Sequence, residues 1–221
     1  MNRTGASRAR DRQGAVSAAP SGNPSRLYRH SRRFYLRPTL VVARELIGCT
    51  LVRKTRRGIL AGRIVEVEAY LGRRDPASHS YRGRTARNDV MFWEGGHLYV
   101  YFTYGMHYCC NVVTGKEGLG HAILIRALEP TAGIAEMMRN RGAAQALPDL
   151  CRGPARICQA MRITRQENGT DLCGSTIWIG SGRNLPRLHV SRSPRIGIRR
   201  GKEHLWRFTM TGSPFLSRPV P

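Results

Sequence analysis

The chain has 221 residues, of which 41% are hydrophobic, so it can bury one well-formed core but hardly two. Its 37 Lys and Arg residues outnumber 14 Asp and Glu residues, which gives a formal net charge of +23 at pH 7 and an isoelectric point of about 11.3. No apolar run reaches the roughly 18 residues that a membrane span needs, so a helical membrane protein is excluded and nucleic acid is favoured over a membrane surface as the polyanionic partner.

Residues 1–30 are expected to form a disordered basic arm, because they are rich in Arg, Ser, Ala, Gly and Pro and contain no hydrophobic segment. They do not resemble a secretory signal, and a transit peptide of similar composition is the alternative. Residues 1–33 contain eight Arg and one Asp, a net +7, which leaves +16 of the total on the remainder. The single domain expected over residues 31–221 is therefore basic in its own right.

The first regular element predicted is a short helix over residues 39–47. Pro38 and Thr39 precede a largely apolar run, and Gly48 follows it. Pro and Thr are typical of a helix start, and Gly is typical of its end. We therefore expect a helix that is capped near Thr39 and terminated by Gly48.

An antiparallel hairpin is predicted next. Residues 49–54 and 59–70 have strand character and are separated by a turn at 56–58. Side chains alternate between the two faces of a strand, so the end of the second strand divides into an apolar face and a face with two carboxylates and a tyrosine. The apolar face comprises Val65, Val67 and Ala69, and the polar face comprises Glu66, Glu68 and Tyr70.

A loop over residues 75–88 is predicted to contact phosphate, because it is dense in Ser, Gly, Thr and Arg. Two aromatic strands, 97–103 and 107–113, follow it. The turn between them contains Gly105, and Tyr104 is expected at or near the tip of this hairpin.

The C-terminal half is expected to contain a strand over 121–129 that Pro130 ends, because proline lacks the N–H that a strand ladder needs. Loops and short strands on a positive surface are expected over the last forty or so residues. The elements together indicate an α+β fold: a single domain with a curved antiparallel sheet, a protruding aromatic β-hairpin and surrounding helices. The two helices of this half are predicted from a Thr131 cap to Arg141 with Gly142 as the stop, and from Pro154 to about Arg162.

Arg126 lies within an otherwise apolar strand, where its guanidinium would be costly to bury unless a carboxylate meets it. Glu66 and Glu68 are the natural partners. Either this is a structural ion pair, or it is a functional site if the group also lines a cleft.

Several tyrosines cluster within about forty residues of this basic chain, and they could either pack in the core or stack on nucleic-acid bases. The six cysteines show no C-x-x-C spacing, so we expect free buried thiols, no metal and no other cofactor. The tyrosines are Tyr70, Tyr99, Tyr101, Tyr104 and Tyr108.

Five ordered motifs resemble the alkyladenine (3-methyladenine) DNA glycosylase family. The resemblance covers nearly everything from about Ser31 to Arg218, and the order and spacing of the motifs make it specific. The motifs are the runs Ile64–Gly72, Asp75–His79, Arg84–Asn88, Leu98–His107 and Arg126–Pro130.

The resemblance implies a residue-by-residue site. Glu68 matches the general base that deprotonates a water for attack at the sugar C1′, and Arg126 matches the residue that helps to hold that water and the carboxylate. Tyr104 matches the side chain that intercalates where a base has been flipped out. The implied substrate-binding residues are Tyr70, Ala77, His79, Tyr101, Asn111 and Leu124, and the implied DNA-binding residues are Arg84, Arg87, Asn88 and Met106.

The resemblance also implies a role for each residue of the pocket. Tyr70, His79 and Tyr101 sandwich the flipped base, with the His79 backbone reading its edge, and Asn111 crowds the 2-amino group of guanine. In a looser alignment, Met210 supplies a carbonyl for the water. Two departures concern loop conformation only: Ala86 stands where relatives often have proline, and the turn at 93–96 is atypical.

The function implied is that of a monofunctional DNA glycosylase in base excision repair, which hydrolyses the N-glycosidic bond of alkylated or deaminated purines. A lyase would need an amine nucleophile, and Lys54, Lys116 and Lys202 all lie outside the tyrosine–glutamate constellation. We expect a monomer that acts on damaged double-stranded DNA, away from membranes: in the cytoplasm and nucleoid of a bacterium, or in the nucleus or mitochondria of a eukaryote. The alternative is a non-catalytic basic nucleic-acid-binding module.

Overall fold

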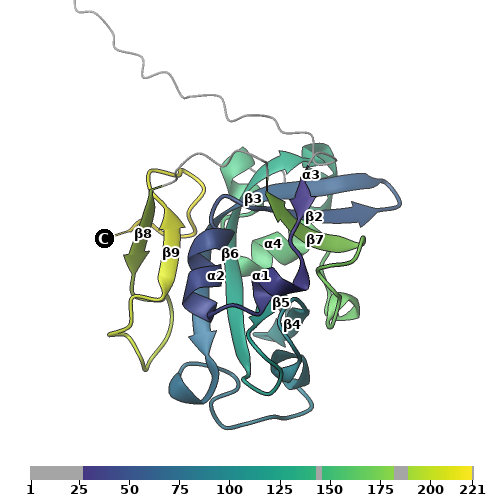
Figure 1. The fold of residues 1–221 in the computed structure, drawn as a ribbon. Helices are drawn as coiled ribbons and strands as arrows, with labels where there is room; N and C mark the ends of the chain where they lie inside the picture. Colours follow the sequence, from purple (N-terminus) through teal and green to yellow (C-terminus); the bar gives the residue numbers. More distant parts are fainter. Residues whose placement is uncertain (1–26, 143–145, 182–188, 221) are drawn as a thin grey trace, which may run out of the picture.

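The long strand β3 (Gly58–Leu71) organises the sheet. One edge of β3 pairs with β6 (His121–Ala132), while its other edge pairs first with β2 (Thr50–Thr55) and then with β9 (Arg207–Met210). The computed structural model describes residues 27–142, 146–181 and 189–220, and these form a nine-stranded antiparallel sheet (Figure 1).

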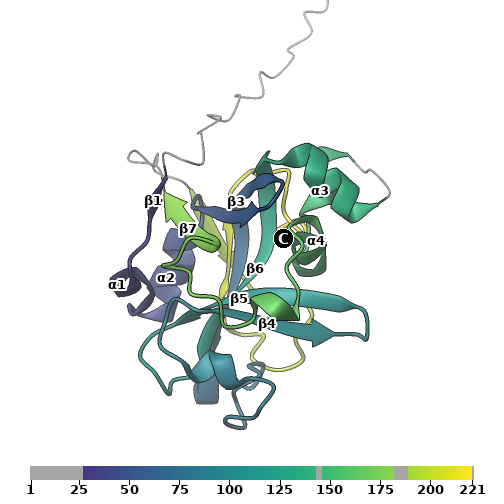
Figure 2. The same cartoon turned by 90° about the vertical axis from the view of Figure 1, so that its right-hand side faces the viewer.

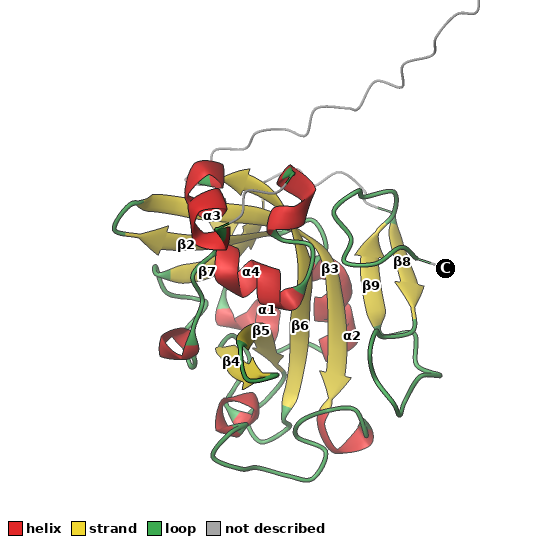
Figure 3. Cartoon of the chain, turned by 180° about the vertical axis from the view of Figure 1, so that it is seen from behind, coloured by secondary structure: helices red, strands yellow, loops and turns green. Residues whose placement is uncertain are grey.

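The remaining strands extend this sheet in both directions. The main path runs β1-β7-β2-β3-β6-β5-β4, and β8 joins through β9. Figure 3 shows β6, β3, β9 and β8 side by side. These strands are β1 (Tyr28–Arg29), β4 (Leu98–Thr103), β5 (His107–Thr114), β7 (Ile177–Ser181) and β8 (Val190–Ser193).

The helices are short and lie against the sheet. Figures 2 and 3 show α2 and α4 on opposite sides of β3 and β6. The α-helices are α1 (Arg32–Tyr35), α2 (Thr39–Leu46), α3 (Ile134–Arg141) and α4 (Pro154–Ala160). Single turns of 3-10 helix cover Gly72–Arg74, Asp89–Phe92, Leu147–Leu150 and Arg165–Glu167.

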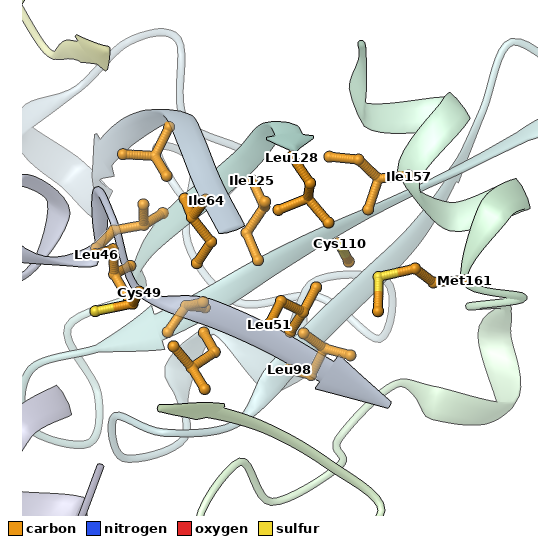
Figure 4. Packing of buried hydrophobic residues seen from close by; sticks show 14 of the residues in the cluster. Leu46, Cys49, Leu51, Ile64, Leu98, Cys110, Ile125, Leu128, Ile157 and Met161 are labelled. Carbon is orange, nitrogen blue, oxygen red and sulfur yellow. The ribbon is translucent and has the colours of Figure 1, made fainter. Parts of the chain in front are cut away.

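The main hydrophobic core connects the helices through the sheet. Leu46 of α2 packs in the same buried cluster as Ile64 of β3, Ile125 of β6 and Ile157 of α4 (Figure 4). Burying such side chains contributes about 1.5–3 kcal/mol each, which makes this cluster the frame on which the polar face of β3 is held.

Two β-bulges modify the predicted alternation along β3. The pairing with β6 shifts between Ile64 and Glu66, which leaves Val65 as an extra residue, and shifts again between Glu66 and Val67, which leaves Arg126 as an extra residue on β6. A bulge turns the following side chains by one position. The core therefore receives Ile64 with Val67 and Ala69, and the prediction that Val65 shares their face is wrong.

The second hairpin turns through three residues between paired Thr103 and His107. Gly105 has φ +66°, and Tyr104 has φ +52°, a left-handed conformation that is uncommon for a residue with a side chain. Strained positions of this kind concentrate at functional segments.

The predicted ends of α2 and α3 are confirmed, and the two predicted threonine caps are wrong. Thr39 is the first residue of α2 and makes no cap; its hydroxyl instead contacts Nδ1 of His121 at 3.0 Å. Thr131 belongs to β6, and α3 is preceded by Gly133 in a left-handed conformation. Gly48 follows α2 with φ +90°, and Gly142 closes α3 with φ +72°.

Pro130 does not end its strand. β6 continues to Ala132, with Pro130 opposite Gly62 at a register shift. Proline is tolerated at bulges and on strand edges, and β5 pairs with β6 only over residues 121–124. The missing N–H of Pro130 is therefore compatible with the ladder.

The predicted basic arm, residues 1–30, falls mostly on residues 1–26, which lie outside the described residues. Its last part is part of the domain: Tyr28 and Arg29 form β1, which pairs with Gly180 and Ser181 of β7. The boundary at residue 30 is therefore too late, because backbone pairing with a distant strand carries no local sequence signal.

Candidate active site

Arg126 joins the two glutamates of β3. Its Nε lies 3.2 Å from Oε1 of Glu66, and its Nη1 lies 3.2 Å from Oε2 of Glu68. Both glutamate side chains are fully buried. The prediction that Arg126 meets both carboxylates is confirmed, and the bulge at Arg126 turns its side chain onto their face of the sheet.

Glu66 is enclosed by further donors. Nε of Arg207, which is also buried, lies 2.8 Å from Oε1, and Ser217 donates its N–H to Oε2 at 2.6 Å and its hydroxyl to Oε1 at 2.8 Å. A buried charge is tolerated when it is paired and hydrogen-bonded in this way. Glu66 therefore ties β3 to β9 and to the C-terminal segment.

Glu68 has a different environment. Tyr70 donates its hydroxyl to Oε2 at 2.9 Å, and Ile196 donates its N–H to Oε1 at 2.7 Å. Burial and then the Glu68 charge raise the pKa of Tyr70, so its hydroxyl keeps its proton. Burial alone would lower the pKa of Arg126, but the charges of Glu68 and Glu66 outweigh it and raise that pKa.

A cavity of about 660 Å³ opens beside this group. Its volume lies within the range of roughly 300–1,000 Å³ that is typical of small-molecule pockets. Glu68 itself does not line the cavity. Its hydrogen-bond partners Tyr70 and Arg126 both do. The predicted residues that line the cavity are Tyr70, Ala77, His79, Tyr101, Tyr104, Asn111, Leu124 and Arg126.

Aromatic rings form one wall of the cavity. The rings of His79 and Tyr101 meet edge to face with centroids 4.5 Å apart, and Nδ1 of His79 lies 3.2 Å from the hydroxyl of buried Tyr99. Burial and then the charge of Arg87 lower the pKa of His79. Asn111 faces the same space and donates its amide to the carbonyl of Tyr99 at 3.2 Å.

The hairpin tip presents two large apolar side chains to solvent. Tyr104 is 88% exposed and Met106 is 69% exposed. Exposed apolar groups of this size at the rim of a cavity are typical of a binding surface. Tyr104 lines the cavity mouth, whereas Met106 does not.

The loop of residues 75–88 presents exposed cations beside the cavity. Arg84 contacts Asp89 with Nε–Oδ1 2.6 Å, and Arg87 donates to the carbonyl of Phe102 at 3.2 Å. Asn88 differs from them, because it is buried and its amide donates to the carbonyls of His79 and Gly83. Asn88 therefore shapes the loop and holds the His79 backbone, and its side chain is not free to contact DNA in this conformation.

Sequence reasoning missed one wall of the cavity. Residues 196–200 line it, in a segment that shows neither apolar periodicity nor a motif. The Ile196 N–H on Glu68 fixes this segment against the site. Met210, for which a water-binding carbonyl was expected, lies on β9 opposite Val190 and does not line the cavity. Arg207 was also missed, because a cation at a strand end is indistinguishable from a surface residue in the sequence.

Within residues 27–142, 146–181 and 189–220, no group of three or more His, Cys, Asp or Glu side chains is placed to hold a metal ion. The six cysteines are free, and five of them are buried. Of the helices that the structure describes, none is long and apolar enough to cross a membrane.

Known proteins resemble this chain over most of its length. A family model described as methylpurine-DNA glycosylase matches residues 33–214. A protein of Burkholderia lata is 48% identical over 191 residues, which cover 86% of this chain and 91% of the relative. A protein of Carboxydothermus hydrogenoformans is 46% identical over 188 residues, 85% of this chain and 97% of the relative. Both relatives are provisionally named 3-methyladenine DNA glycosylase. The chain therefore belongs to the methylpurine-DNA glycosylase family.

Proposed function

We propose that the protein flips an alkylated or deaminated purine out of duplex DNA into the 660 Å³ cavity and hydrolyses its N-glycosidic bond with a water that Glu68 activates. The water oxygen bonds to C1′ of the sugar, the bond between C1′ and the purine nitrogen breaks with its electron pair leaving on the base, and Glu68 accepts the proton of the water. The negative carboxylate also faces the oxocarbenium-like sugar of the transition state.

The bonding of Glu68 is the observation that carries this proposal. A carboxylate can accept about four hydrogen bonds, and the structure accounts for three, from Arg126, Tyr70 and Ile196. We assign the remaining acceptor position to the attacking water, which must reach it from the cavity because Glu68 itself is fully buried. Arg126, Tyr70 and Ile196 all line the cavity. The three hydrogen-bond donors to the Glu68 carboxylate are therefore also part of the wall of the proposed purine pocket.

The cavity walls suit a flat aromatic guest. Tyr70, His79 and Tyr101 offer ring surfaces on which a purine can stack. Because burial lowers the pKa of His79, its ring is neutral at pH 7 and does not repel a cationic methylated base. We assign 3-methyladenine, 7-methylguanine, hypoxanthine and ethenoadenine as candidate substrates, with Asn111 restricting normal guanine.

The same geometry favours a hydrolase without lyase activity. A Schiff-base mechanism requires an amine close to C1′. Lys54, Lys116 and Lys202 are the lysines of the chain, and they are absent from the cavity lining among the described residues.

Contacts with DNA are proposed around the cavity mouth. Tyr104 would fill the space that the flipped base leaves, with Met106 beside it at the hairpin tip. Exposed Arg84 and Arg87 of the loop after β3, together with Arg199 and Arg200 of the cavity lining, would contact phosphates. The chain would bind damaged double-stranded DNA as a monomer.

Glu68→Gln tests the proposal. The substitution keeps the size of the side chain but removes the charge and the proton acceptor, so single-turnover release of methylated purines should fall by about 10²–10⁴-fold. Affinity for a lesion duplex should survive, because the phosphate contacts and Tyr104 are unchanged. Base release at the wild-type rate would remove Glu68 from the mechanism.

Glu129→Gln is the matched control. Glu129 lies on β6 and pairs with Arg63 at 2.5 Å, so this change also removes one ion pair between β3 and β6, but away from the cavity. Its base-release rate should stay close to that of the wild type. Glu66→Gln is unsuitable as this control, because Glu66 holds Arg207 and Ser217.

A further inference from the structure

A buried ion pair outside the cavity lies against Tyr70, one of the hydrogen-bond donors of Glu68. Arg195 contacts Asp75 through two bonds, Nη1–Oδ2 2.5 Å and Nη2–Oδ1 2.8 Å, and both side chains are fully buried. Replacing such a pair by apolar groups is often neutral or stabilising, so its presence is weak evidence of a stabilising role. Its surroundings point to a different role.

The guanidinium of Arg195 lies on the ring of Tyr70. Its central carbon is 4.6 Å from the Tyr70 ring centroid and 5.0 Å from that of Trp206, and Trp206 in turn stacks on His204 at 4.0 Å. Tyr70 lines the cavity, whereas Arg195 and Trp206 do not. Arg195 therefore supports the Tyr70 ring from the side away from the proposed base pocket.

Arg195 is next to both hydrogen-bond donors of Glu68 other than Arg126. Tyr70, whose ring Arg195 supports, donates to Oε2 at 2.9 Å. Ile196, the neighbour of Arg195 in the chain, donates its N–H to Oε1 at 2.7 Å. Nη1 of Arg195 also donates to the carbonyl of Ala69, which lies between Glu68 and Tyr70 in β3.

Asp75 anchors this arrangement to the loop that enters the cavity. Its carboxylate accepts the N–H of Leu71 at 3.2 Å and that of Ala77 at 3.1 Å, in addition to the two bonds from Arg195. Ala77 and the nearby His79 line the cavity. The loop after β3 and the segment before β9 are therefore held together at one buried carboxylate.

We propose that Arg195, fixed by Asp75, is a positioning residue of the active site: it sets the place of the Glu68 carboxylate through Tyr70 and Ile196 and supports the Tyr70 wall of the base pocket. This inference rests on the proposed function, since it assigns Glu68 as the base. Misplacing a reacting group by about 1 Å can cost about 10²-fold in rate. Disturbing Arg195 should thus slow the chemical step while DNA binding persists.

Arg195→Lys is the first test. Lysine keeps the charge opposite Asp75, but it cannot make the planar two-bond contact or lie flat on Tyr70. The expected result is a 10–100-fold loss in single-turnover release of bases from dimethyl-sulfate-treated DNA. Affinity for a duplex with a tetrahydrofuran abasic site should change less than threefold, because that DNA carries no base to be positioned. Arg63→Lys, at the Arg63–Glu129 pair of β3 and β6, is the control and should leave both quantities unchanged.

Rates are normalised to the concentration of protein that binds the tetrahydrofuran duplex, so that partial unfolding cannot imitate a slow chemical step. If Arg195→Lys folds poorly, the double variant Asp75→Asn with Arg195→Gln replaces the buried charges by a neutral hydrogen-bonding pair. Either folded variant with wild-type base release would overturn the proposal. Failure of the wild-type protein to release any methylated base would instead refute the proposed function.

Discussion

Replacing Glu66 by glutamine should destabilise the fold much more than it changes the chemistry. Three donors meet Oε1 of Glu66, from Arg126, Arg207 and the Ser217 hydroxyl, and the Ser217 N–H meets Oε2. In Glu66→Gln, the amide oxygen can take the position of Oε1. The amide N–H groups then face the Ser217 N–H, where two donors meet and no acceptor is present.

The expected cost follows from the loss of a buried charge. Arg207 keeps neutral acceptors, the Ser193 hydroxyl at 3.3 Å and the carbonyl of Arg218 at 2.6 Å, but it loses its carboxylate partner. Removing one partner of a buried ion pair typically costs about 3–5 kcal/mol. For a chain of this length, that free energy lowers the unfolding midpoint by about 6–20 °C.

Thermal unfolding of Glu66→Gln measures this directly, with base release followed well below the midpoint. Glu45→Gln is the control, because Glu45 pairs with Arg37 at 2.5 Å while remaining 46% exposed, and an exposed pair contributes about 0–1 kcal/mol. The rate of base release per folded molecule should fall far less in Glu66→Gln than in Glu68→Gln. A midpoint for Glu66→Gln equal to that of Glu45→Gln would refute the structural role given to Glu66.

Two further predictions concern the DNA interface and the acid stability of the fold. Tyr104→Ser should weaken binding to a lesion duplex far more than binding to a nonspecific single strand, because serine cannot fill the gap left by an extruded base; equal losses in titrations of both DNAs would make Tyr104 an ordinary surface residue. His30→Gln should make the unfolding midpoint less sensitive to acid. Burial and then the charge of Arg37 lower the pKa of His30 from its ordinary 6.5 to about 4, so the unfolded chain binds the proton more tightly than the folded protein. The contribution of neutral His30 to the free energy of unfolding is therefore complete above pH 6.5 and is lost as the pH falls towards 4. Parallel declines of the midpoint in both proteins over this range would contradict the assignment to His30.

Local sequence patterns were sufficient to predict the main elements of the fold. The hairpin of β2 and β3 and the shared face of Glu66, Glu68 and Tyr70 follow from the two-residue period of a strand, which depends on neighbouring residues alone. The pairing of Arg126 with a carboxylate was also predictable from the sequence, because a cation within an apolar run is costly to bury without a partner of opposite charge. Glycines predicted the ends of α2 and α3 for the same local reason.

Features that depend on distant pairing could not be predicted in this way. The bulges at Val65 and Arg126 arise from shifts in the register between β3 and β6. Strand β6 continues beyond Pro130 because β5 pairs with β6 only over residues 121–124, so no β5 partner needs the missing N–H. No periodicity of a single strand records the register of its partner.

The sequence by itself determined which residue types would come together, because an arginine in an apolar strand needs a carboxylate partner and alternation puts Glu66, Glu68 and Tyr70 on one strand face. Only the tertiary structure decided what holds them. Asp75 and Arg195 are 120 positions apart, and Ile196 is 128 positions from Glu68. Contacts at such separations form when the chain closes its long loops around the core, and the residues that make them look like any other surface Asp or Arg until their burial is known.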